Sequence, residues 1–177
     1  LNGSPFINAQ NRYRIASGNS TAIFQGDLVK PLASGTITRY VANTSDTVVG
    51  VFNGCFYTDP TTQKPTFSNF YPQSTNASDI TAFVIDAPDT VFEVNANAVF
   101  AVADIFKNYS VNNVTGSTQT GISLVQLDVA QSGVDGTYVV QAIDISQDPN
   151  NSDVATSNAN IMVRINNHFY RQGGTGL

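Results

Sequence analysis

Charged side chains are scarce in this sequence of 177 residues. Asp, Glu, Lys and Arg make up 12% of it, about half the share typical of globular proteins, and neutral Asn, Thr and Ser take their place. A surface of amides and hydroxyls forms hydrogen bonds without strong charge repulsion, which favours assembly. The eight Lys and Arg residues are scattered and the net charge is -5. We therefore expect no direct nucleic-acid partner, because phosphate binding requires clustered cations.

Cysteine and long apolar runs are almost missing as well. Cys55 is the only cysteine, so no disulfide can form within the chain and no cysteine-based zinc site exists. No apolar run approaches the length of a transmembrane helix, and we expect no membrane partner. With 41% apolar residues, the chain nevertheless has enough material for a hydrophobic core.

Residues for catalysis are few. His168 is the only histidine, just after an expected strand, and we interpret it as a surface or strand-end residue. Asp86 and Asp89 flank Pro88 and fit turn residues better than a catalytic pair. The chain has one glutamate, Glu93, and no phosphate-binding glycine motif. We expect no enzymatic activity and no cofactor.

A calcium site is the least implausible metal hypothesis. Carboxylate and amide oxygens suit this cation, and they are densest between residues 144 and 153. The group lacks the ligand spacing of a calcium-binding loop, so we interpret it as a solvated loop. Its members are Asp144, Asp148, Asn150, Asn151 and Asp153.

Short runs of β-branched and aromatic residues, separated by turn residues, recur along the chain and predict an all-β fold. Several runs alternate apolar and polar residues, as strands with one buried face do. The expected strands are Arg12–Ser17, Thr21–Phe24, Gly26–Lys30, Thr36–Val41, Thr47–Phe52, Cys55–Thr58, Ile80–Asp86, Val91–Val94, Ile122–Asp128, Thr137–Ile145 and Ile161–Asn166. Asn53-Gly54 and Asp135-Gly136 are among the dipeptides expected at tight reversals.

The remaining segments complete a single-domain prediction. We expect a single compact sandwich or barrel of antiparallel strands over residues 12–171, between an irregular N-terminal arm, 1–11, and a flexible tail, 172–177. Residues 95–106 are the best helix candidate, and at most one short helix is expected. The proline-rich segment 58–76 is expected to be a loop. No internal repeat of fixed period is apparent.

Several motifs follow one another in a recognisable order. They are Gly3-Ser4-Pro5-Phe6, Tyr13-Arg14-Ile15-Ala16-Ser17, Ala22-Ile23-Phe24-Gln25-Gly26-Asp27-Leu28-Val29, Val48-Val49-Gly50-Val51-Phe52 and Val163-Arg164-Ile165-Asn166-Asn167-His168. Their order and spacing resemble the capsid decoration (cement) proteins of tailed bacteriophages, particularly those of marine phages. Each motif alone is weakly specific, and the resemblance spans nearly the whole chain.

The resemblance implies a structural virion protein on the outer capsid surface, made in the cytoplasm of the bacterial host. It further implies that the major capsid protein and other copies of the chain are partners, often as a homotrimer at a local three-fold position. Such a subunit would clamp seams between capsid subunits against the outward pressure of packaged DNA, and many modest sites would act together.

Two contact regions are expected from the residues themselves. The first is the N-terminal arm, where Phe6 and Ile7 are the apolar anchors. The second is the proline-rich segment with Phe67, Phe70 and Tyr71, because aromatic residues there either pack on the core or meet a partner.

Two other function classes remain open at this point. One is a different virion component, a tail-tube or head–tail connector subunit. The other is a carbohydrate-binding adhesion module. Trp, the usual sugar-stacking residue, is missing, although Tyr could substitute for it.

Overall fold

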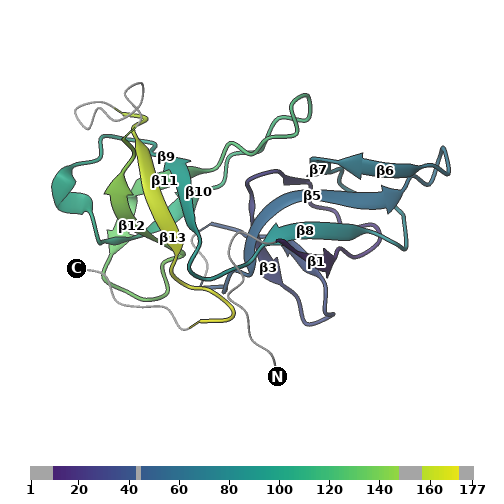
Figure 1. The fold of residues 1–177 in the computed structure, drawn as a ribbon, viewed down its shortest axis with the longest axis horizontal. Helices are drawn as coiled ribbons and strands as arrows, with labels where there is room; N and C mark the ends of the chain where they lie inside the picture. Colours follow the sequence, from purple (N-terminus) through teal and green to yellow (C-terminus); the bar gives the residue numbers. More distant parts are fainter. Residues whose placement is uncertain (1–9, 43–44, 148–156, 172–177) are drawn as a thin grey trace.

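The computed structural model describes residues 10–42, 45–147 and 157–171, which form two lobes of antiparallel sheet (Figure 1). The first lobe contains β1 (Gln10–Arg14), β3 (Leu28–Pro31), β4 (Ile37–Arg39), β5 (Gly50–Thr58), β6 (Pro65–Ser68) and β8 (Thr81–Ile85). The second contains β9 (Val91–Asn95), β10 (Asn108–Asn112), β11 (Gln126–Gly133), β12 (Val140–Ile145) and β13 (Asn160–Ile165). A small third sheet pairs β2 (Ile23–Phe24) with β7 (Phe70–Tyr71). The predicted all-β class is confirmed.

The two lobes share one strand order. Along the first sheet the order is β1-β8-β5-β3-β4, with β6 added to β5, and along the second it is β9-β13-β12-β10-β11. Numbered by chain position within each lobe, with β6 left out, both read first, fifth, fourth, second, third. In both, the fourth and fifth strands pair with an irregular register that indicates a β-bulge. The structure therefore contains a repeat of topology that the sequence did not reveal.

Each sheet also curls in the same way. In the first lobe, Ile15, just after the first strand, forms a parallel bridge with Ile37 in the third. In the second lobe, Ala96 and Leu127 form the matching bridge. A single bridge brings the outer strands together without completing a barrel ladder.

The hydrophobic interior is divided between the lobes. One cluster fills the first lobe, around Phe52 and Tyr71, and a larger one fills the second, around Phe100 and Tyr109. Leu28, Tyr40 and Val48, which belong to the first half of the chain, pack into the second cluster. The prediction of one domain over residues 12–171 stays a prediction, but residues of the first half help to fill the core of the second lobe.

A strap formed by residues 113–125 crosses from the second lobe to the first. It leaves β10 and extends toward β7 in Figure 1. Gln25 N donates to Gly121 O over 3.0 Å, and Ser123 N donates to Gln25 O over 2.9 Å. Gly116 lies so close to the ring of Phe24 that a Cβ would sit 2.4 Å from Phe24 Cγ. The strap thus holds the lobes together through backbone pairing and close packing.

Three local predictions were wrong. Of the predicted helix at residues 95–106, the structure contains one turn of 3₁₀ helix, η1 (Val102–Asp104). A longer helix does not form because Ala96 and Phe100 are held in the core and Phe106 has a φ of 71°. Segment 58–76 is not all loop, since β6 pairs with β5 and β7 with β2. Asn53-Gly54 lies at an irregularity within β5, where Gly54 has a φ of 121°, and the strand does not reverse.

Burial of Cys55 leads to a first prediction. Its side chain is 1% exposed and donates to Phe70 O, and burial raises the pKa of the thiol to about 12. Because the thiolate is the reactive species, we expect a colorimetric thiol reagent to label the folded protein very slowly at neutral pH. Labelling should become rapid in denaturing urea. Rapid labelling without denaturant would contradict this packing.

Candidate interaction surface

An aromatic patch of one exposed ring and two half-buried rings lies on the outer face of the first lobe. We define it as Phe56 on β5, Phe67 on β6 and Phe83 on β8. Phe56 and Phe67 are direct cross-strand partners with ring centroids 4.8 Å apart, and Phe67 and Phe83 are 6.3 Å apart. The alternation of β5 and β8 produces this face, because Phe52, Ala82 and Val84 point inward. Phe67 is 76% exposed, an unusual state for a large apolar ring.

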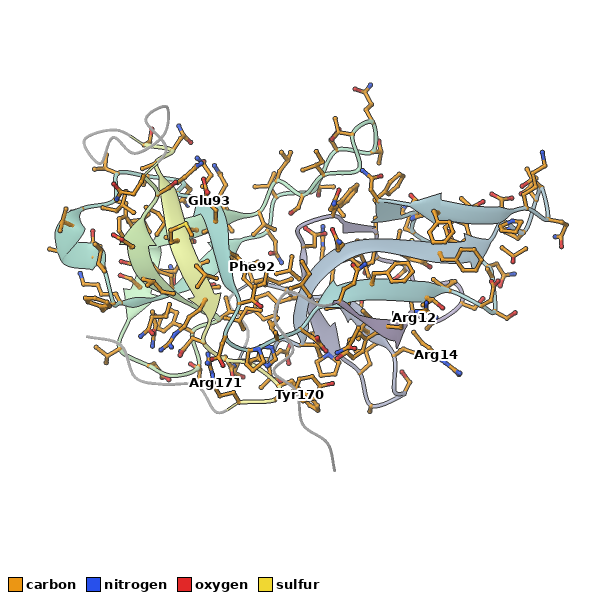
Figure 2. The ribbon with its side chains drawn as sticks, in the orientation of Figure 1. Arg12, Arg14, Phe92, Glu93, Tyr170 and Arg171 are labelled. Atoms are coloured by element: carbon orange, nitrogen blue, oxygen red, sulfur yellow. The ribbon has the colours of Figure 1, made fainter. Side chains whose placement is uncertain are left out.

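Two arginines border the aromatic patch on β1. Arg12 is paired in register with Phe83, and its guanidinium lies 6.0 Å from the centre of that ring. Arg14 is paired with Thr81, which is in turn paired with Phe56. Figure 2 shows both arginines on the first lobe, with Arg14 extending away from the ribbon. Within the described part of the chain, neither has an ion pair. The combination suits a partner with apolar groups beside carboxylates.

The structure separates the residues predicted to make contacts. Phe67 is exposed, whereas Phe70 is half-buried and stacks on Phe24. Tyr71 is completely buried, and its hydroxyl donates to Asn19 O, so it is a core residue and not a surface contact. Phe6 and Ile7 lie outside the described residues. Phe56 and Phe83 were missed, although the alternation of their predicted strands placed them opposite the buried residues.

A cluster of polar side chains joins the lobes at Asp86. Tyr13 donates to Asp86 Oδ2 over 2.5 Å, and Asn11 Nδ2 donates to both carboxylate oxygens over 3.0 and 2.9 Å. The hydroxyls of Tyr13 and Tyr170 are 2.9 Å apart. Burial and the bond to Asp86 raise the pKa of Tyr13 far above its usual value, which keeps the phenol protonated. This carboxylate is occupied by bonds within the chain, and its partners lie far away in sequence, contrary to the expectation of a simple turn residue.

His168 is buried and not on the surface, which corrects the sequence interpretation. Its Nδ1 accepts from Tyr170 N over 3.1 Å, and its backbone bridges to Val48. Desolvation, reinforced by Arg171, lowers its pKa, so the ring is neutral near pH 7. The imidazole therefore orders the chain after β13, and its Nδ1 is not free to serve a nucleophile.

Asp89 also has a structural partner. It accepts from Arg171 Nη1 over 2.7 Å at the surface, while Arg171 Nη2 donates to Ile165 O. Asp86 and Asp89 thus hold different segments of the chain.

Most of the group that we interpreted as a solvated loop lies outside the described residues. These members are Asp148, Asn150, Asn151 and Asp153. Asp144 is described, and its Oδ1 accepts from Ile145 N over 2.8 Å. Across residues 10–42, 45–147 and 157–171, no group of three or more His, Cys, Asp and Glu side chains could hold a metal ion. In the same residues, no helix has the length and apolar character needed to cross a membrane.

Comparison of the chain with protein-family models, with curated proteins and with solved structures finds no match.

Proposed function

We propose that this protein is a structural subunit of a bacteriophage particle, which binds the outer surface of the capsid and bridges major capsid protein subunits. The observation that carries the proposal is the aromatic patch beside Arg12 and Arg14. The order of the sequence motifs supports the same assignment, and with it assembly as a trimer on the shell.

The chemistry of the patch fits a contact with a protein surface. Three adjacent rings offer apolar area whose burial stabilises a complex, and aromatic and arginine side chains are the types that most often dominate binding energy. The rings project from paired strands, so binding requires little ordering of the backbone. Repetition over a symmetric shell would convert modest single contacts into firm attachment.

The location of the protein on virions tests the proposal most directly. Antibody raised against the recombinant protein should place immunogold label evenly over the heads of intact particles. Label confined to the tail or neck would contradict the capsid role and favour a tail-tube or connector subunit. Absence of label from all particles would contradict an outer-surface position, and the carbohydrate-binding alternative would then be tested on a glycan array.

A variant of the patch predicts a loss of capsid binding. In co-sedimentation with heads stripped of this protein, we expect Phe67→Ser to weaken binding about tenfold or more, because a central aromatic contact is worth roughly 2 kcal/mol. The matched control is Val102→Ser, since Val102 is similarly exposed but belongs to the second lobe. Equal binding by Phe67→Ser and the wild type, with circular dichroism unchanged, would exclude the patch as the contact.

A further inference from the structure

The repeated topology makes β1 and β9 equivalent strands with opposite charges. Each is the first strand of its lobe, has five residues and pairs with the fifth strand along its whole length. In these registers Arg12 is opposite Phe83 on β8, and Glu93 is opposite Met162 on β13. Arg12 and Glu93 are both the third residue of their strands, and both are exposed. The same position in the repeated topology, the third residue of the first strand, therefore carries a cation in the first lobe and an anion in the second.

Both strands lie at the edge of their sheet. β1 forms a ladder only with β8, and β9 only with β13. The single bridges to β4 and β11 lie just past these strands, at Ile15 and at Ala96. In an antiparallel ladder, alternate residues of an edge strand direct N–H and C=O groups outward. Such groups can pair with another strand, and charged side chains on the edge decide which strand is accepted.

The charges on these edges have no ionic partner within the described part of the chain. Lys30, Lys107 and Arg171 form the ion pairs found there. Glu93 accepts a hydrogen bond from the amide of Asn160, which leaves its charge unneutralised. Figure 2 shows Glu93 on the second lobe and Arg12 on the first, so the opposite charges belong to different sheets.

We propose that β1 of one copy pairs edge to edge with β9 of a second copy, antiparallel, with Arg12 opposite Glu93. In this register Gln10 comes opposite Asn95, and Tyr13 comes opposite Phe92. The exposed side chains of both strands then lie on one continuous outer face. A second copy is the occupant because the chain supplies both complementary edges, of equal length.

The β9 edge also borders an apolar groove that the incoming strand would cover. The groove has a volume of about 310 Å³ and includes Leu28, Phe92 and Val125 in its lining. Covering it removes apolar surface from water and adds to the backbone hydrogen bonds of the new strand pair. The contact joins two different surfaces, so each copy keeps one free edge and association continues to a ring or a chain.

Charge reversal tests the pairing in solution. By sedimentation velocity we expect the wild type to self-associate and salt to weaken the association. Arg12→Glu and Glu93→Arg should each lower the association constant at least tenfold. The double variant R12E/E93R should recover association, and so should an equimolar mixture of the single variants. Lys64→Glu, a reversal on an exposed turn, is the matched control and should associate like the wild type.

The inference does not depend on the capsid proposal, and the two tests separate them, because Glu93 is not part of the aromatic patch. A wild type that remains monomeric up to about 1 mM would overturn the edge pairing. Single variants that associate normally, or a double variant that stays as weak as the single ones, would also overturn it.

Discussion

Gly50→Ala should destabilise the folded protein by at least about 3 kcal/mol, at the upper end of the cost of overpacking a core. Gly50 begins β5 and is buried where this strand crosses β8. A Cβ there would lie 2.2 Å from Ile85 O, 2.8 Å from Val84 Cγ1 and 2.9 Å from Asp86 Cα. Two of these atoms are backbone, so no rotamer change relieves the overlap. Relief would require shifting β8, which is also paired with β1, and would disturb the bonds of Asp86 to Tyr13 and Asn11.

Urea unfolding followed by circular dichroism measures this effect. The matched control is Gly18→Ala. Gly18 has a φ of 71° but open space around its Cβ position, so this variant should lose only about 1–2 kcal/mol through backbone strain. The comparison separates packing from backbone conformation. A Gly50→Ala protein as stable as the Gly18→Ala protein would show that β5 and β8 are farther apart than the structure places them.

The strands were predictable because their signal is local. Alternation in Ile80–Asp86 and Ile161–Asn166 reflects one buried face, and β8 and β13 lie there. β10 was missed because Asn108-Tyr109-Ser110-Val111-Asn112 contains polar residues at buried positions. Asn108 and Ser110 are buried, and pairing of β10 with β11 and β12 overrides their low strand propensity.

The repeat escaped the sequence because its loops differ between the lobes. The second and third strands are joined by the tight turn 32–36 in the first lobe and by the strap in the second. Topology is preserved by which strands pair, and pairing is not encoded at a fixed period. The opposite charges of Arg12 and Glu93 become related only through that shared framework.

Only part of the candidate surface could be predicted from the sequence, because exposure also depends on which strands pair. Proline density singled out the segment that carries Phe67, but whether an aromatic residue in it is exposed depends on strand register. Tyr71 faces the core because β7 pairs with β2, and Phe67 faces outward because it is paired with Phe56. Neither pairing could be read from the local pattern.

Asp27 shows how a motif that is weak in sequence acquires a physical role. Asp27 follows Gly26, which has a φ of 99°, in the turn before β3. Its Oδ2 accepts from Phe24 N over 2.8 Å, and its Oδ1 accepts from Ser123 Oγ over 2.6 Å. The carboxylate is fully buried, and it ties the strap to the first lobe.

Asp27→Ala should therefore lower the free energy of unfolding by about 2–4 kcal/mol, because it leaves two donors at a buried site without their acceptor. Asp27→Asn is the matched variant. Its carbonyl oxygen can still accept from Phe24 N, and its amide can donate to Ser123 Oγ, so we expect a loss near neutral pH of less than about 1.5 kcal/mol. Equal losses in both variants, measured by urea unfolding, would contradict the role of these two bonds.

The pH dependence of the same pair of proteins gives an independent test. Desolvation raises the pKa of Asp27, against the lowering effects of the bonds from Phe24 and Ser123 and of Arg39. The folded state therefore holds this proton more tightly than the unfolded chain, whose aspartate titrates near about 4. The stability that Asp27 contributes is fully present below that unfolded pKa and is lost as the pH rises through the folded value. Asparagine does not titrate, so the stability of the wild type relative to Asp27→Asn should fall as the pH rises from acidic to neutral. A difference that rises with pH would mean that the hydrogen bonds outweigh the burial of the carboxylate.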